Sequence, residues 1–370
     1  RVSERIAARG GPIPFAEYME LVLYAPGLGY YAGGLRKFGT EGDFVTAPEI
    51  APLFSRCLAH QCAEVLAGLG GGEILEFGAG SGAMAAGILG ELRRLGREPE
   101  RYGILEVSSE LRTRQRETLA ALAPDELGRV QWLDRLPGSP LRGVVLANEV
   151  LDAMPVERFR IAPDGVRELR VDREDEHLIW AEGPAGGRLA ATVGRLQRDL
   201  PEPLAPGYSS EVNPALEPWL AGVADVLAAG VVLLIDYGYP RREYYHPERA
   251  TGTLMCHYRH RAHSDPLILP GLQDITAHVD FTAVAQAGVD AGLRLAGYTT
   301  QAHFLLGAGL AALLTDSDPT DVRRHLALTQ QVKTLTLPGE MGERFKALAF
   351  TRGFDAPLAG FALRDLRDRL

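Results

Sequence analysis

The chain has 370 residues, enough for one elaborated domain or two smaller ones, and its 46% hydrophobic and 24% charged residues are typical of a soluble globular protein. A formal net charge of −9 argues against a dedicated nucleic-acid binder, because such proteins carry a basic surface. We expect no membrane insertion and no signal or transit peptide, since neither apolar pattern occurs. Cys57, Cys62 and Cys256 show neither a disulfide framework nor zinc-ligand spacing, so buried thiols and a bacterial cytoplasmic location are expected.

The first 70 residues predict an N-terminal cap made of helices and loops. Two short helices are expected within residues 1–30. Long loops over 24–31 and 38–50 carry glycines, aromatic residues and carboxylates. Loops of this length are usually functional or disordered, and the aromatic content disfavours disorder. We therefore expect the cap to contribute to an active site, with Asp43 as a candidate catalytic residue; a structural clamp is the alternative.

A glycine-rich turn, Glu-Phe-Gly-Ala-Gly-Ser-Gly, spans Glu76 to Gly82 between a short apolar strand and an Ala/Leu-rich helix over 83–95. Strand, glycine turn and helix is the arrangement in which helix N–H groups face a nucleotide-like ligand. A β-carbon at Gly78, Gly80 or Gly82 would hinder the turn or hold the ligand away. A tight turn without a ligand gives the same pattern, so further signals are needed.

A second expected strand starts near Arg101 and ends in a carboxylate, Glu106. At this place a parallel α/β sheet binds the two ribose hydroxyls of a nucleoside. The turn has Gly-x-Gly-x-Gly, not the Gly-x-Gly-x-x-Gly dinucleotide fingerprint, and Glu76 stands two residues before its first glycine. This combination predicts S-adenosylmethionine (SAM) as the cofactor, because no pyrophosphate has to be seated. Glu76 contacts the cofactor or supports the backbone of the turn.

The third and fourth expected strands also end in candidate ligands. Trp132 and Asp134 stand at the end of the third strand, where adenine should lie, with core packing as the alternative for Trp132. Asn148 and Glu149 stand at the carboxyl end of the fourth strand, where open α/β sheets place residues that contact ligands. Asp152 follows as a further candidate, with a helix N-cap as its alternative role.

The remainder of the chain predicts insertions and the end of the sheet. We expect a SAM-binding domain over 71–370 with insertions at about 156–228 and 240–280. The expected elements are antiparallel strands within 156–182, helices near 187–199 and 214–228, a buried strand over 231–239, a helix near 281–292, a strand near 293–299, and then mostly helical material to the C-terminus.

Five motifs, in order and spacing, resemble those of the MidA-like SAM-dependent methyltransferases. The motifs are Gly39-Thr-Glu-Gly-Asp-Phe-Val-Thr-Ala-Pro-Glu-Ile, Glu76 to Gly82, Ala147-Asn-Glu-Val-Leu-Asp-Ala-Met-Pro-Val, Ile235-Asp-Tyr-Gly-Tyr, and Gly271-Leu-Gln-Asp-Ile-Thr-Ala-His-Val-Asp-Phe. The resemblance covers about residues 13–346. It implies an α/β fold with a seven-stranded class I SAM-methyltransferase sheet, which is Rossmann-like, with inserted strands and helices. The mitochondrial member of the family is known as an arginine methyltransferase that assists assembly of respiratory complex I.

The resemblance implies a SAM-dependent protein arginine N-methyltransferase whose partner is a protein substrate, such as a complex I subunit. A guanidinium group is always charged and pairs with carboxylates, so acidic residues beside the methyl donor are needed. Glu149, Asn148 and Asp152 are the substrate-side candidates, together with Asp43. The family commonly carries Thr where this chain has Ala83, and Asp where it has Gly87.

Several alternatives stay open at this point. The chain could methylate another protein or a small-molecule nucleophile, because fold does not determine the acceptor. The residues at 83 and 87 leave room for a non-catalytic SAM-binding assembly factor. An NAD dehydrogenase has the wrong glycine spacing, and His257, His260 and His263 give only a weak metal signal, so no metal is expected. The oligomeric state is open, with a homodimer among the alternatives.

Overall fold

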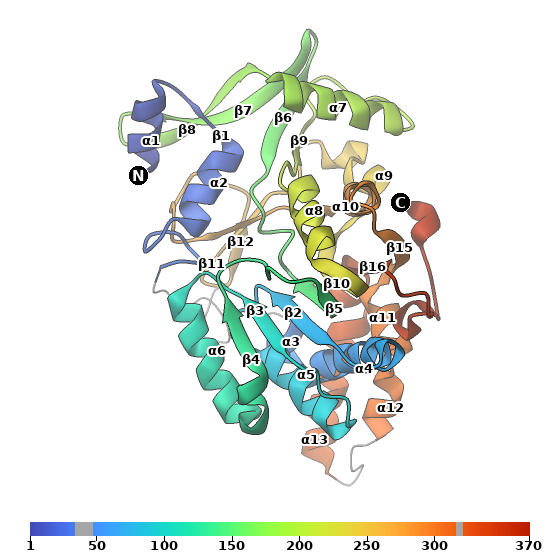
Figure 1. The fold of residues 1–370 in the computed structure, drawn as a ribbon. Helices are drawn as coiled ribbons and strands as arrows, with labels where there is room; N and C mark the ends of the chain where they lie inside the picture. Colours follow the sequence, from blue (N-terminus) through green and yellow to red (C-terminus); the bar gives the residue numbers. More distant parts are fainter. Residues whose placement is uncertain (34–46, 316–320) are drawn as a thin grey trace. The chain divides into compact units, whose positions relative to one another are not determined.

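The computed structural model describes residues 1–33, 47–315 and 321–370, which form two compact units (Figure 1). The unit that we call the insertion unit comprises Arg1–Phe44, Asp152–Leu216 and Tyr239–Ala283. The other, the sheet unit, comprises Val45–Leu151, Glu217–Gly238 and Val284–Leu370. The division at residue 70 expected from the sequence stays a prediction.

The sheet unit is built on a mixed sheet. Seven of its strands lie in the spatial order β15 (Arg294–Thr300), β16 (Phe345–Arg352), β10 (Leu227–Tyr239), β5 (Leu141–Asn148), β2 (Glu73–Phe77), β3 (Tyr102–Leu105) and β4 (Val130–Leu133). The five strands from β10 to β4 are parallel, whereas β16 runs antiparallel to both of its neighbours. The predicted α/β class is confirmed, and these seven strands are consistent with the expected seven-stranded sheet.

Glycines at the start of the central strands allow their backbones to approach closely. Gly143 of β5 lies between Glu73 of β2 and Gly230 of β10 in the ladder. A β-carbon built on Gly143 would lie 1.8 Å from the carbonyl oxygen of Glu73, and its φ of 147° disfavours any side chain. A glycine is therefore required where these strands enter the sheet.

Helices cover both faces of this sheet (Figure 1). Residues such as Ile74 and Leu146 share a core with α4 and α5, whereas Phe77 meets Trp219 of α8 with ring centroids 5.1 Å apart. The helices of this unit are α3 (Ala47–Ile50), α4 (Pro52–Leu69), α5 (Ala83–Arg94), α6 (Ser109–Leu122), α8 (Leu216–Val226), α10 (Phe281–Asp290), α11 (Gln301–Gly307), α12 (Leu310–Thr315), α13 (Val322–Thr336) and α14 (Met341–Arg344). Both faces are apolar, as expected for parallel strands with helices on each side.

Strand β16 corrects the expectation that the chain is mostly helical after residue 299. Its sequence, Phe-Lys-Ala-Leu-Ala-Phe-Thr-Arg, is a short apolar run, and such runs fit a buried strand or a buried helix equally well. The six residues between Phe345 and Arg352 are all buried, because β16 is paired on both sides by β10 and β15. Long-range pairing therefore decides its conformation.

The insertion unit contains the antiparallel strands expected within 156–182. One sheet has the order β1 (Ile13–Pro14), β7 (Gly165–Glu174), β6 (Glu157–Ala162) and β9 (Ser209–Val212), with β8 (His177–Pro184) paired to β7. A smaller sheet has the order β12 (Arg261–His263), β11 (Met255–Tyr258) and β13 (Asp274–Thr276). The helices are α1 (Val2–Arg9), α2 (Phe15–Tyr24), α7 (Gly187–Asp199) and α9 (Arg241–Tyr244); a short strand, β14 (Val279–Asp280), precedes α10. The two N-terminal helices and α7 confirm the sequence-based expectation.

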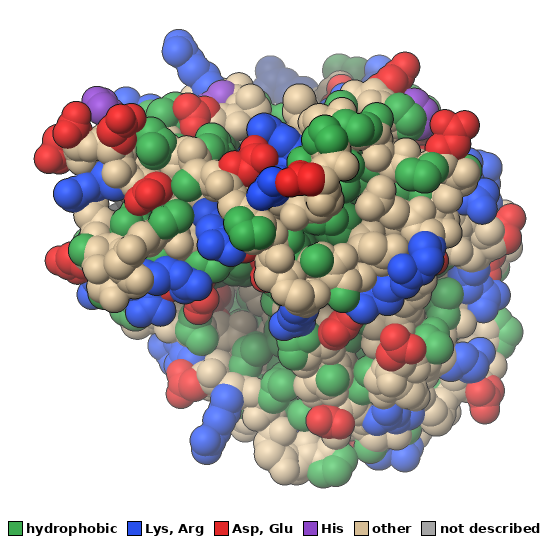
Figure 2. All heavy atoms as spheres, turned by 90° about the horizontal axis from the view of Figure 1, so that it is seen from above, with side chains coloured by type: hydrophobic (Ala, Val, Ile, Leu, Met, Phe, Trp, Pro, Cys, Tyr) green, Lys and Arg blue, Asp and Glu red, His purple; other side chains and the backbone are tan. Residues whose placement is uncertain are grey.

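The charged surface and the buried cysteines agree with what the composition predicts. Acidic and basic side chains are interspersed over the face shown in Figure 2. Cys57 and Cys62 are buried in α4, as expected, and burial raises the pKa of each thiol to about 12. In the described parts of the chain, no helix combines the length and the apolar character that crossing a membrane requires.

Two helical glycines offer a matched test of the packing in the sheet unit. Gly288 of α10 faces the buried ring of Phe350 in β16, and a β-carbon there would lie 2.2 Å from that ring. Gly288→Ala should therefore lower the free energy of unfolding by about 1–3 kcal/mol through overpacking. Gly90→Ala in α5 has nothing within 4 Å of its β-carbon and should raise it by about 0.5–1 kcal/mol. Urea titrations of both variants measure these shifts; equal shifts would contradict the predicted contact.

Candidate cofactor and active site

The candidate site lies where the five parallel strands of the sheet unit end. Phe77 of β2 pairs with Leu105 of β3 and with Ala147 of β5, and Leu105 pairs with Leu133 of β4. Because these strands are parallel and in register, the residues that follow them meet at one edge of the sheet. The residues that follow β2, β3, β4 and β5 are Gly78, Glu106, Asp134 and Glu149. Asp236 of β10 lies beside them, because the preceding Ile235 pairs with Asn148, the last residue of β5. We call this the carboxyl edge.

The glycine turn adopts a backbone that favours glycine at all three positions. Gly78, Gly80 and Gly82 have φ of 61°, 52° and 84°. Gly82 is also the N-cap of α5, and a β-carbon on it would lie 3.0 Å from the Cα of Gln115 in α6. The glycines are therefore required by the turn and by its packing, whether or not a ligand is bound.

Glu76 is buried directly before the turn. Its neighbours on the same sheet face are apolar, and only its Oε2 is paired, accepting a 2.8 Å hydrogen bond from the hydroxyl of Tyr102. Among the described residues Oε1 has no hydrogen-bond partner. Burial raises the pKa of Glu76 to about 8; the Tyr102 hydrogen bond opposes this, and the charge of Glu106 adds to it. The Glu76 carboxyl group therefore binds a proton near neutral pH.

Glu106 is held in a fixed orientation after β3. Its Oε1 accepts from the main-chain N–H of Ser108 at 2.9 Å, and its Oε2 accepts from Nε2 of Gln115 at 3.1 Å. The side chain is buried, which raises its pKa, while these hydrogen bonds favour the charged form. Ser108 is the N-cap of α6, and its side chain accepts from the N–H of Leu111. The carboxylate is thus oriented by the strand end and by α6.

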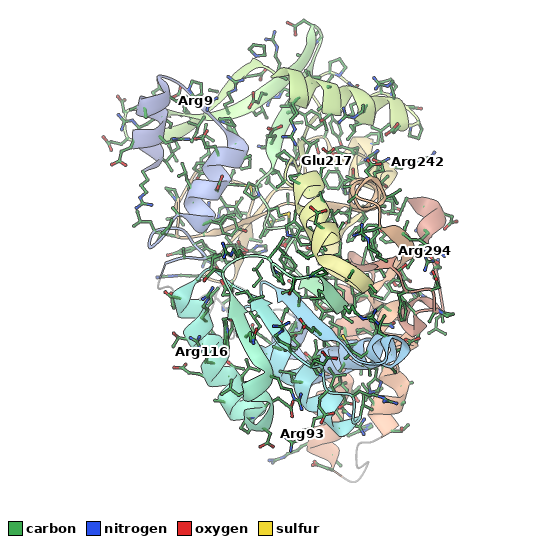
Figure 3. The ribbon with its side chains drawn as sticks, viewed as in Figure 1. Arg9, Arg93, Arg116, Glu217, Arg242 and Arg294 are labelled. Carbon is green, nitrogen blue, oxygen red and sulfur yellow. The ribbon has the colours of Figure 1, made fainter. Side chains whose placement is uncertain are left out.

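Trp132 and Asp134 are tied to the same helix. The indole N–H of Trp132 donates to Oε1 of Gln115 at 2.9 Å, and the ring also packs against the core of the unit. Arg116 lies on α6 (Figure 3) with its Cζ 4.4 Å from the centre of the Trp132 ring. Asp134 is exposed and pairs with Arg112, which also donates to the carbonyl of Glu106, directly after β3, and to that of Leu133, at the end of β4. Trp132 therefore packs in the core and also makes a hydrogen bond to Gln115.

Asn148 and Glu149 stand together at the end of β5. The side-chain amide of Asn148 donates to Oε1 of Glu149 at 3.1 Å, and among the described residues its Oδ1 has no partner. Glu149 has φ of 52°, which is uncommon for a residue with a side chain, and its N–H donates to the carbonyl of Ile235 at 2.9 Å. Asp236 accepts from the N–H groups of Leu151 and Tyr237, so it supports the loop after β5.

The other two predicted catalytic residues are Asp43 and Asp152. Asp43 lies outside the described residues. Asp152 is the first residue of its segment in the insertion unit, where it is buried and its main-chain carbonyl accepts from Ala277 at 2.9 Å. Asp152 lies in a turn that leads into β6, and no helix begins there, so its alternative role as a helix N-cap is wrong.

The sequence did not indicate the residues that connect the edge. Gln115 and Arg112 stand three residues apart in a polar helix, and nothing in their spacing distinguishes them from surface residues. Tyr102, the partner of Glu76, has the pattern of a core residue of β3. Across the described residues, no group of three or more His, Cys, Asp or Glu side chains could hold a metal ion.

A family model described as "Putative S-adenosyl-L-methionine-dependent methyltransferase" matches residues 57–299. This range includes all the described residues of the carboxyl edge. The match confirms the resemblance predicted from the five motifs and, with it, S-adenosylmethionine as the cofactor.

Named relatives and solved structures agree with this match. The mouse "Protein arginine methyltransferase NDUFAF7, mitochondrial" is 30% identical over 92% of this chain and 81% of its own length. Its Drosophila melanogaster homologue is 29% identical over 95% of this chain and 86% of its own length. A Burkholderia thailandensis protein, described as a "likely methyl transferase" and bound to S-adenosyl-homocysteine, superposes with a TM-score of 0.94 at 48% identity, covering 100% of this chain and 95% of that one. A native crystal structure from the same organism gives 0.91 at 47% identity, with the same coverage.

The raised pKa of Glu76 predicts how stability depends on pH. Unfolding returns the pKa to its ordinary value of 4.5, so between that pH and about 8 the folded protein binds one more proton. The stability present below pH 4.5 is therefore lost as pH rises through this window, by up to about 1.4 kcal/mol per pH unit. Glu76→Gln removes this titration and should flatten the fall in unfolding free energy between about pH 5 and pH 8.

Urea unfolding of the cofactor-free protein at several pH values measures that slope. Glu110→Gln, the same substitution at an exposed position of α6, serves as the control. A slope that Glu76→Gln leaves unchanged would show that the buried carboxyl group does not bind the extra proton.

Proposed function

The chain belongs to the family of S-adenosyl-L-methionine-dependent methyltransferases, and we propose that its methyl acceptor is the guanidinium group of an arginine in a protein substrate. The observation that supports this acceptor is the similarity to protein arginine methyltransferases along 91–95% of the chain. A subunit of respiratory complex I, or a similar protein, is the first substrate to test. A bacterial cytoplasmic location stays a prediction.

The carboxyl edge has polar atoms that suit this cofactor. Oδ1 of Asn148 is a buried acceptor that lacks a partner among the described residues, and Oε1 of Glu76 becomes one when the carboxyl group loses its proton; a buried acceptor favours a donor such as an ammonium group. Glu106 would accept from the ribose hydroxyls, and Trp132 and Asp134 would line the adenine side. Gly78, Gly80 and Gly82 would let the cofactor approach the backbone.

When bound, S-adenosylmethionine supplies an electrophilic methyl group on a sulfonium centre. Glu149 would pair with the guanidinium group and direct one nitrogen towards that methyl group. As the nitrogen–carbon bond forms and the sulfur–carbon bond breaks, the arginine nitrogen loses a proton, which the Glu149 carboxylate can accept and pass to water. The amide of Asn148 would hold the carboxylate in place. Asp152 and Asp43 remain candidates for contacts with the substrate.

The backbone of Glu149 supports its assignment. A left-handed φ at a residue with a side chain costs of the order of 1 kcal/mol, and such conformations concentrate at functional sites. The hydrogen bond to Ile235 of β10 holds this conformation, so the carboxylate leaves the sheet edge in a defined direction. A surface glutamate would not need this arrangement.

Mass spectrometry of labelled proteins tests the acceptor. The purified enzyme, given SAM with a trideuterated methyl group and a bacterial protein extract that contains complex I, should label arginine side chains. Label on lysine, on a carboxylate or on a small molecule would identify that group, and not arginine, as the methyl acceptor. Binding of SAM without label in any of these fractions would favour the alternative, a non-catalytic SAM-binding assembly factor.

A charge-neutral substitution at position 149 separates binding from chemistry. Glu149→Gln keeps the shape of the side chain but removes the charge that pairs with the guanidinium group. SAM affinity should change less than about 2-fold, while methyl transfer falls by roughly 100-fold, the scale of a lost charge-assisted contact in an active site. Calorimetric titration with SAM and single-turnover methylation, on one preparation, measure the two effects. Undiminished transfer would remove Glu149 from the mechanism.

A further inference from the structure

Gln115 of α6 joins three separate parts of the carboxyl edge. Its Nε2 donates to the carbonyl of Gly80 in the glycine turn and to Oε2 of Glu106, each at 3.1 Å. Its Oε1 accepts from the indole N–H of Trp132 at 2.9 Å. The residue is fully buried, and one side-chain amide therefore contacts the segments after β2 and β3 and the strand β4.

The backbone of α6 is held against the same turn. A β-carbon at Gly82 would lie 3.0 Å from the Cα of Gln115 and 3.3 Å from its Cβ. The glycine turn thus meets both the backbone and the side chain of Gln115. A shift of α6 would move the turn and the Glu106 carboxylate together.

Core packing alone does not explain a glutamine at this position. Burying an amide is unfavourable unless its donors and acceptor are paired, and a leucine of similar size would fill the space without that requirement. Both donors and the acceptor of Gln115 are used, and every partner belongs to the carboxyl edge. The hydrogen bond that Gln115 donates also favours the ionised form of the Glu106 carboxyl group. An ionised carboxylate only accepts hydrogen bonds, and the ribose hydroxyl groups need such an acceptor.

We propose that Gln115 is the positioning residue of the cofactor site, which locks the Glu106 carboxylate to the glycine turn and to Trp132. It does not contact the methyl group or the acceptor. It sets the direction in which Glu106 meets the ribose, so that the nucleoside half of the cofactor finds a preformed site. This inference uses the cofactor of the family and does not depend on which group is methylated.

Binding measurements with three variants test the proposal without any methyl acceptor. Gln115→Leu removes all three hydrogen bonds and should weaken SAM and S-adenosylhomocysteine equally, by about 10-fold or more, because both contain the ribose. Trp132→Phe removes only the indole donor and should weaken both by about 2–3-fold. Glu117→Gln, at an exposed position of the same helix, should bind like the wild type.

Gln115→Glu distinguishes positioning from packing, because it keeps the size of the side chain. The introduced carboxylate faces Glu106 and the Gly80 carbonyl and repels both, so SAM affinity should fall by about 10-fold or more near pH 8. Protonation at lower pH restores a donor, so the deficit relative to the wild type at the same pH should shrink towards about pH 5.5. A packing role would give no such pH dependence.

Calorimetric titrations at these pH values, with thermal unfolding of each variant, distinguish the two roles. Wild-type affinity in a folded Gln115→Leu protein would overturn the proposal, as would a Gln115→Glu deficit that is absent or independent of pH. If Gln115→Leu fails to fold, the pH series of Gln115→Glu is sufficient to support or overturn the proposal.

Discussion

The parallel register of β10, β5, β2, β3 and β4 is the constraint on which the site depends. It brings the residues after each strand to one edge, although they are far apart in the sequence. Close approach of the backbones at Gly143 sets this register where the strands begin, and apolar faces covered by helices maintain it. The apolar faces of the sheet supply the stability of this unit. The few polar side chains at the carboxyl edge are therefore available to bind a ligand.

Local patterns in the sequence predict much of this edge. The glycine turn, the strand-end Glu106 and the pair Asn148 and Glu149 follow directly from strands that end in glycine or polar residues. Gln115 could not be found this way, because its role comes from three partners on other segments and its helix has a polar sequence. Strand β16 was missed for a related reason: an apolar run of eight residues fits a helix or a strand until its neighbours are known.

Electrostatics at the edge are set by burial more than by pairing. Glu76 has one hydroxyl donor and an apolar surrounding, so burial keeps it protonated, whereas Glu106 receives a main-chain and an amide donor. Burial raises the pKa of both carboxyl groups, but the main-chain and amide donors to Glu106 oppose that rise and favour its charged form. A cation that arrives beside Glu76 would favour loss of its proton, so binding a positively charged cofactor and proton release from this residue are expected to be linked.

The two departures from the family pattern, Ala83 and Gly87, differ in what the structure explains about them. A β-carbon at Gly87 would lie 2.6 Å from the Cβ of Ser55, so the small residues at 55 and 87 let α4 and α5 approach closely. An aspartate at 87 would require α4 to move away from α5. The absence of a carboxylate at 87 therefore goes with the close packing of these two helices. Ala83 is different, because it is the first residue of α5, directly after the glycine turn, and no such contact explains it. Any effect of these departures on catalysis is thus expected from the missing hydroxyl at 83, and the glycine at 87 gives no reason to regard the site as inactive.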